Sequence, residues 1–145
     1  MIIRLTGKLL RLGYPRAGRA SLVESALAPM RALRDAVGET VQLGLPIGDE
    51  GVIIEQVEST QAVRICVEIG LRFQLHNNAP GKVLLAFQHL KSREKTIQRL
   101  KLARFTSRTI TGKEALRQEC ERVVNLGYST DWGEADEGIH CVAAP

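Results

Sequence analysis

The segment 75–87 constrains the fold more than any other part of the chain, because a polar turn leads directly into an apolar helix. Asn77 and Asn78 are predicted to cap this helix. Pro80 fits the first helical turn, where its missing N–H is least costly. Backbone N–H groups and Lys82 therefore gather at the positive end of a helix, an arrangement that suits a small anion.

The residues before this segment predict a helix followed by strands. A capping box covers 21–24, and apolar residues continue at helical spacing to Val37. Pro29 lies inside the pattern and predicts a kink or a break into two helices. Alternating patterns then predict a hairpin and a third strand; the three strands cover 40–45, 52–57 and 63–67.

The residues after the segment predict further helices and a final pair of strands. We expect a charged helix over 92–102, and a second capping box at 111–114 opens a helix that ends at Gly127. Residues 128–131 and 139–144 resemble strands around an acidic loop. This order of elements predicts an α+β domain with a largely antiparallel sheet.

Composition indicates one cytoplasmic domain. The chain has 145 residues, 44% of them apolar and 25% charged, which is enough for one buried core. No apolar run approaches the roughly 20 residues of a membrane-spanning helix, so no membrane partner is predicted. The three cysteines, Cys66, Cys120 and Cys141, have no CxxC spacing, which favours reduced thiols over disulfides or a zinc site.

The net charge of +4 is unevenly distributed. Residues 1–23 contain five basic residues and no acidic one. Such an arm can contact a phosphate backbone, and the alternative is a solvated linker. Nothing in it resembles a recognition helix, so the arm alone does not predict a DNA-binding module.

No catalytic group or cofactor site is predicted. Asp131 and Cys141 lie on strand-like segments that can face the helix end, as in a pocket for a small acid. A cysteine nucleophile needs a base, but His140 is its strand neighbour and points to the opposite face. His76, His140, Cys141 and Asp131 match no known zinc-ligand spacing, and there is no phosphate loop or dinucleotide fingerprint.

Several motifs together resemble the effector-binding domain of the IclR-type transcriptional regulators. The strongest are Leu75-His76 with Gly81-Lys82-Val83-Leu84-Leu85-Ala86-Phe87, then Thr109-Ile110-Thr111, then the run from Gly127-Tyr128 to Pro145, all in the family's order. The resemblance implies a GAF-like or profilin-like sensor fold, with a curved, mostly antiparallel sheet and flanking helices. It also implies an effector that is a small carboxylate or an aromatic acid.

The resemblance also implies the binding residues. Pro80 falls where the family presents a backbone N–H to the ligand carboxylate, so one donor is missing. Each residue has a structural alternative: Cys141 as a small core side chain, Asp131 as a turn cap and Lys82 as a solvated cation. The implied effector-binding residues are Ala79, Pro80, Gly81, Lys82, Asp131 and Cys141.

We therefore expect residues 1–20 to be a linker from an N-terminal DNA-binding domain that is absent here, and 21–145 to be an incomplete effector-binding domain. Homodimers or homotetramers, a small organic acid, and operator DNA bound through that absent domain are the expected partners. The isolated chain is expected to self-associate or to be poorly stable. The alternatives are a cysteine-dependent hydrolase or transferase that uses Cys141, and a dimerisation module with no ligand.

Overall fold

The structure is a computed structural model that describes residues 22–145. The predicted linker at 1–20 and the first residue of the capping box at 21–24 lie outside the described residues. The described part forms two compact units, one of residues 22–43 and 55–67 and the other of residues 44–54 and 68–145. No helix of this part is long and apolar enough to cross a membrane.

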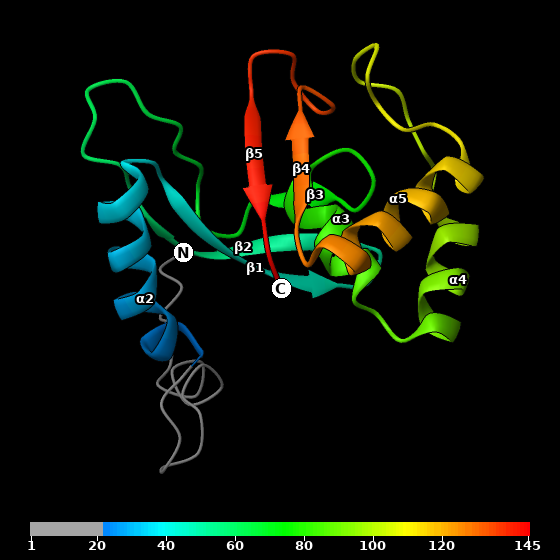
Figure 1. Cartoon of the computed structure of the whole chain (residues 1–145), viewed down its shortest axis with the longest axis horizontal. Helices are drawn as coiled ribbons and strands as arrows, with labels where there is room; N and C mark the ends of the chain where they lie inside the picture. The colour runs from blue at the N-terminus through cyan, green and yellow to red at the C-terminus, as the bar shows by residue number, and fades with distance from the viewer. Residues whose placement is uncertain (1–21) are drawn as a thin grey trace, which may run out of the picture. The chain divides into compact units, whose positions relative to one another are not determined.

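The first unit contains α2 (Leu22–Val37), which continues through Pro29 as one helix (Figure 1). A break into two helices was therefore the wrong alternative. The helix ends at Val37, where the apolar pattern stops, and Gly38 follows with a left-handed φ of 76° and an N–H that donates to Arg34 O at 2.8 Å. Met30 is buried, whereas Leu33 is half exposed, so only part of the apolar stripe contributes to a core.

Three strands form one sheet in the order β1-β2-β3, namely β1 (Val41–Ile47), β2 (Glu50–Val57) and β3 (Arg72–Gln74). The predicted hairpin is confirmed, and Gly48 at its two-residue turn has a φ of 62°. The predicted strand at 63–67 is wrong. Its alternating pattern has no face to bury, because Val63 is 91% exposed, and the Val67 N–H donates to the Gln56 side chain instead of a strand.

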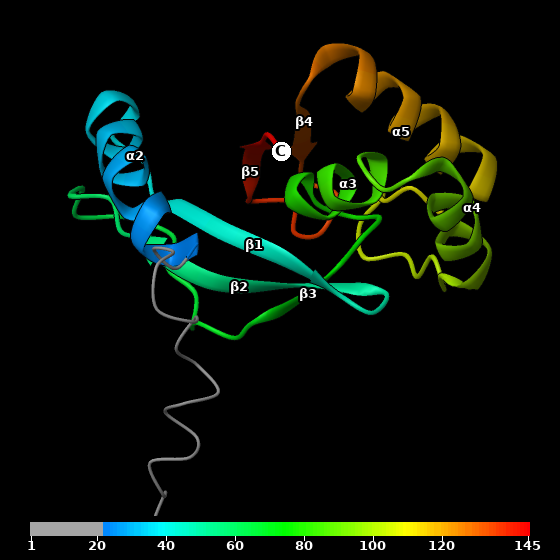
Figure 2. The same ribbon diagram turned by 90° about the horizontal axis from the view of Figure 1, so that it is seen from below.

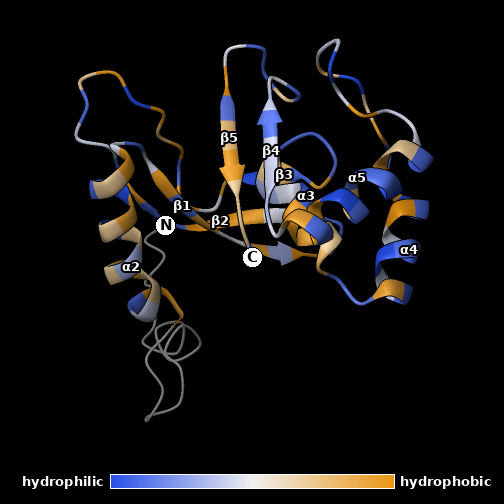
Figure 3. Ribbon diagram, viewed as in Figure 1, coloured by the Kyte–Doolittle hydropathy of each residue, from blue (hydrophilic) through white to orange (hydrophobic). Residues whose placement is uncertain are grey.

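Three helices in the second unit surround its core: α3 (Ala79–Ala86), α4 (Leu90–Arg99) and α5 (Lys113–Leu126). α4 is mostly hydrophilic (Figure 3), but its Ile97 is fully buried. The core consists mainly of Leu75, Val83, Leu85, Ile97, Leu116, Cys120 and Val123. These residues come from the end of β3 and from all three helices.

Two details of these helices differ from the predictions. α3 ends at Ala86, one residue before the end of the predicted segment 75–87, and Phe87 is largely exposed. The second capping box is wrong, because Gly112 is the N-cap of α5 and no side chain caps that end. Gly127 does cap the other end, with a φ of 80°.

A separate antiparallel pair, β4 (Ser129–Trp132) and β5 (His140–Ala143), completes the second unit. α3 contacts both strands and both other helices, so it is the central element of this unit (Figures 1 and 2). Alternation along the strands places Asp131 and Cys141 on the inner side and Trp132 and Val142 on the exposed side. The α+β class with antiparallel sheets is confirmed, although the strands form two sheets.

Candidate functional site

The N-terminus of α3 is capped from within the chain. Asn78 has an extended φ of −152°, and its Oδ1 accepts the Gly81 N–H at 2.8 Å. The Lys82 N–H donates to the Asn78 carbonyl at 3.1 Å, as in an ordinary helical turn. Asn78 is therefore a cap, as predicted. The expectation that unpaired N–H groups gather at this helix end is wrong for Gly81 and Lys82, because both are engaged.

Gly81 allows the helix to start directly against the end of β3. A Cβ at this position would lie 2.2 Å from the Gln74 carbonyl oxygen and 2.8 Å from Leu75 Cα. Both contacts are with backbone, which cannot move aside as a flexible side chain can. Glycine at 81 therefore fixes where the first turn of α3 stands.

Asp131 and Cys141 face the same helix end from the β4–β5 pair, in which they are directly opposite partners. Asp131 is 2% exposed, and its Oδ1 accepts the Glu134 N–H at 2.7 Å. Cys141 is partly buried. Burial raises the pKa of its thiol, an effect that the Ala79 N–H opposes by donating to the sulfur. The structure thus brings Ala79, Asp131 and Cys141 together, and we call this face, with Pro80 and Gly81, the candidate site.

Lys82 turns away from solvent into a cluster of ionised side chains. It is 1% exposed, and its Nζ lies 2.5 Å from Glu134 Oε1 and 3.1 Å from Glu119 Oε1. Glu119 on α5 also accepts two bonds from Arg122, at 2.7 and 2.8 Å. We call these four residues the lysine–carboxylate cluster. The carboxylates that meet Lys82 are therefore the protein's own.

The pKa values of the two carboxyl groups in the cluster are shifted in opposite directions. Burial raises the pKa of Glu134, more than the hydrogen bond from Lys82 lowers it. Burial also acts on Glu119, but Arg122 and Lys82 together keep the pKa of that carboxyl below its ordinary value. Glu134 is the residue in the cluster that is less well compensated.

Glu134 is the residue that the sequence reasoning missed. Its backbone carbonyl accepts the hydroxyls of Thr109 and Thr106 at 2.7 and 3.4 Å, so the loop is anchored at Glu134 itself. Its Oε2 is buried without a hydrogen-bond partner in the described residues. The stretch 134–137 was predicted only as an acidic loop, and no spacing signal shows which of its acids turns inward.

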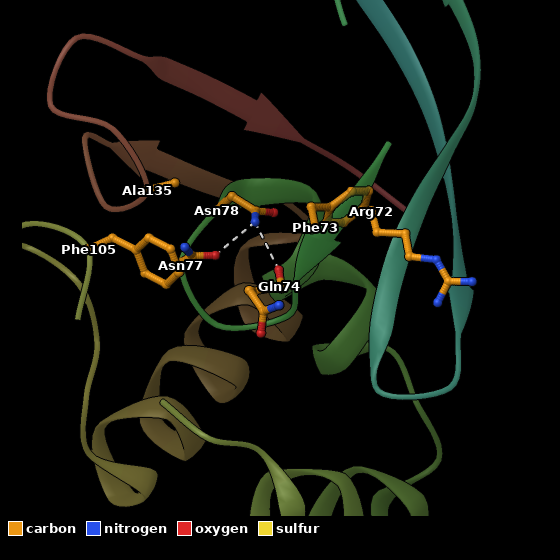
Figure 4. A pocket seen from close by; sticks show the side chains of 7 residues that line it. All are labelled: Arg72, Phe73, Gln74, Asn77, Asn78, Phe105 and Ala135. Carbon is orange, nitrogen blue, oxygen red and sulfur yellow. Dashed lines mark hydrogen bonds between the residues drawn. The ribbon is translucent and has the colours of Figure 1, made fainter. Parts of the chain in front are cut away.

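A hollow of about 320 Å³ lies beside the candidate site, lined by Arg72, Phe73, Gln74, Asn77, Asn78, Phe105 and Ala135 (Figure 4). The Asn78 amide donates to Asn77 Oδ1 at 3.0 Å and to the Gln74 carbonyl at 2.8 Å, which fixes this wall. None of the six predicted binding residues lines the hollow. It is a second place where a small molecule can lie, and the sequence did not predict it.

Two histidines, His76 and His140, take structural positions. His76 is fully buried and its Nε2 lies 3.0 Å from the Ala103 carbonyl. His140 is on the exposed side of β5 and packs edge-on against Trp132, with ring centroids 5.2 Å apart. Within residues 22–145, no group of three or more histidine, cysteine or acidic side chains is placed to hold a metal ion.

Comparison with known proteins gives a consistent result. Residues 16–145 match the family model described as bacterial transcriptional regulator IclR C-terminal. The HTH-type transcriptional regulator KdgR of Escherichia coli K12 is 36% identical over 141 residues, which are 97% of this chain and 54% of KdgR. This chain spans about half the length of the curated relatives it matches.

Comparison with solved structures identifies the same family. The structure of Thermotoga maritima IclR superposes with a TM-score of 0.82 at 32% identity, covering 96% of this chain and 56% of that chain. A homologue from Microbacterium hydrocarbonoxydans, solved in complex with 4-hydroxybenzoate, gives a TM-score of 0.80 at 26% identity, covering 98% and 59%. The fold of the described residues is thus the fold of these proteins.

Proposed function

We propose that this chain, which belongs to the bacterial IclR family of transcriptional regulators, binds a small organic acid and so controls DNA binding by the full-length protein. Its matched region is the family's C-terminal, effector-binding domain. A related structure holds 4-hydroxybenzoate, which supports an acid as the ligand class. Homodimers or homotetramers, and operator DNA bound through an N-terminal domain, are further parts of the proposal.

The observation that carries the proposal is the register of β4 and β5. It places Asp131 opposite Cys141, and the Ala79 N–H reaches the thiol from the start of α3. The described hydrogen bonds occupy Asp131 Oδ1 and leave Oδ2 for a ligand hydroxyl. A carboxylate can compete with the thiol for the Ala79 N–H, which is charge-assisted when an anion accepts it.

The six proposed binding residues contribute in different ways. Ala79, Asp131 and Cys141 offer a donor, an acceptor and a polarisable wall, while Pro80 and Gly81 shape the helix start. Lys82 holds the site together through the lysine–carboxylate cluster. Ligand binding then favours one arrangement of the full-length protein over another, in proportion to its differential affinity for the two.

A cysteine-dependent enzyme receives less support. A catalytic thiol needs a lowered pKa and a nearby base. Here burial raises the pKa of Cys141, and the charged groups that act on it are Asp131, Lys82 and Glu134. The adjacent His140 lies on the exposed side of the strand.

A thermal-shift screen against small organic acids tests the proposal, because a ligand that binds the folded state raises the unfolding temperature. For an acid that stabilises the wild-type chain, Asp131→Asn is expected to weaken binding by about 1–3 kcal/mol while the domain stays folded. Asp136→Asn is the matched control, since Asp136 caps an exposed turn through Gly138. Equal affinity in all three proteins would show that Asp131 is only a turn residue.

A further inference from the structure

The candidate site is bordered by more negative than positive charge. Asp131 accepts a hydrogen bond from the Glu134 N–H, and Lys82 forms salt bridges with both Glu134 and Glu119. Arg122 is the second cation of this connected group. Three carboxylates thus share two cations, which leaves one negative charge in excess next to Cys141.

The start of α3 offsets little of this charge. Its Gly81 and Lys82 N–H groups are used by Asn78, and Pro80 has none. Only the Ala79 N–H, which donates to the Cys141 thiol, can turn to a ligand without uncapping the helix. A second carboxylate on a ligand would have no donor of this kind and would face Asp131 and Glu134.

Building on the proposed function, we propose that Glu134 sets the charge that the site accepts. The site takes a neutral or singly charged small molecule that donates a hydroxyl to Asp131, and it rejects dianions. Glu134 is a specificity-determining residue that acts through its charge, without itself contacting the ligand.

Glu134, and not Glu119, is suited to this role. Glu119 is compensated by two bonds from Arg122 in addition to its contact with Lys82. Glu134 is 9% exposed, and within residues 22–145 its Oε1 is paired whereas its Oε2 is buried without a hydrogen-bond partner. Its N–H is bonded to Asp131, so its charge stands beside the residue that receives the ligand.

Alkylation of Cys141 measures the charge preference without a known ligand. The thiolate sulfur attacks the methylene carbon of either neutral iodoacetamide or anionic iodoacetate, iodide leaves with the bonding electrons, and buffer takes the thiol proton. A change in the thiol's acidity alters both rates equally and cancels in their ratio. The amide-to-acetate rate ratio, divided by its value for the same chain unfolded in urea, reports the local charge.

Mass spectrometry of the full 145-residue chain follows each cysteine separately. Cys66 is exposed and serves as the internal reference for reagent quality, and buried Cys120 reports unfolding. We expect the ratio at Cys141 to exceed the unfolded value by about tenfold, an order of magnitude that one nearby, partly screened unit charge can produce. Glu134→Gln keeps a group that can bond Lys82 and is expected to remove most of this preference. Glu119→Gln also removes one carboxylate that pairs with Lys82, and it is expected to change the preference at Cys141 little.

The wild-type chain supplies a second test that needs no variant to fold. The second test compares modification of Cys141 by cationic 2-aminoethyl methanethiosulfonate and by its neutral methyl analogue. The cationic-to-neutral rate ratio should be higher in the folded chain than in the unfolded chain. A wild-type ratio equal to the unfolded value, an unchanged ratio in folded Glu134→Gln, or an equal effect of Glu119→Gln would overturn the role of Glu134. A folded Cys141 that resists even the neutral reagents would instead count against a ligand site on this face, and so against the proposed function itself.

Discussion

Replacing Lys82 with methionine should destabilise the domain through one uncompensated charge. Lys82 is 1% exposed and bridges Glu134 and Glu119 at 2.5 and 3.1 Å. Removing one partner of a buried ion pair costs about 3–5 kcal/mol, because the other charge stays buried. Glu119 would keep Arg122, so only Glu134 would lose its single partner. We therefore expect about 3 kcal/mol, the lower end of that range.

Urea unfolding at pH 7, followed by the fluorescence of Trp132, measures this loss. The double variant Lys82→Met with Glu134→Gln should recover most of it, because a neutral amide is much cheaper to bury than a carboxylate. Lys113→Met is the control, since Lys113 is a half-buried lysine that bonds the Gln98 carbonyl and, among the described residues, forms no ion pair. A loss below about 1 kcal/mol, typical of an exposed ion pair, would show that the cluster is effectively solvated. No recovery in the double variant would show that the loss came from packing.

Gly81→Ala should cost at least about 3 kcal/mol in urea unfolding because its Cβ would meet backbone at 2.2 Å, whereas at Gly112 the nearest atom is 3.9 Å away and alanine should be tolerated. Pro80→Ala restores an N–H at the start of α3 and should strengthen binding of a carboxylate by about 1 kcal/mol in calorimetry; no gain for any acid would make the missing donor irrelevant. Since burial raises the pKa of Glu134, the folded state holds that proton more tightly, and stability should fall as pH rises from the ordinary value of 4.5 through the raised one. Glu134→Gln should lack this decline, and parallel pH profiles for the two proteins would refute it.

Elements whose pattern matched their burial were predictable from the sequence. The helix after Asn78, the hairpin around Gly48 and the stop at Gly127 depend on local chemistry that a few residues specify. The strands 129–132 and 140–143 were placed within one residue at each end. The strand expected at 63–67 failed because alternation predicts a strand only when one face is buried.

The candidate site was predictable in part. Family motifs brought Ala79, Asp131 and Cys141 to one face, and the structure places them together. The direction of the Lys82 side chain depends on Glu119 and Glu134, which are 37 and 52 residues away along the chain. Contacts at such separations are decided by how α5 and the β4–β5 loop pack on α3, and no local pattern specifies them.

The central claim, that the face formed by Ala79, Asp131 and Cys141 holds a small acid, is tested most directly by NMR of the chain labelled with ¹⁵N-alanine. Titration with the acid that gives the largest thermal shift should move the Ala79 and Ala143 resonances saturably, while Ala115 on α5 stays unchanged. Ala135 lines the neighbouring hollow and separates the two places where a ligand can lie. Saturable shifts at Ala135 with none at Ala79, or no saturable shift with any acid, would contradict the account.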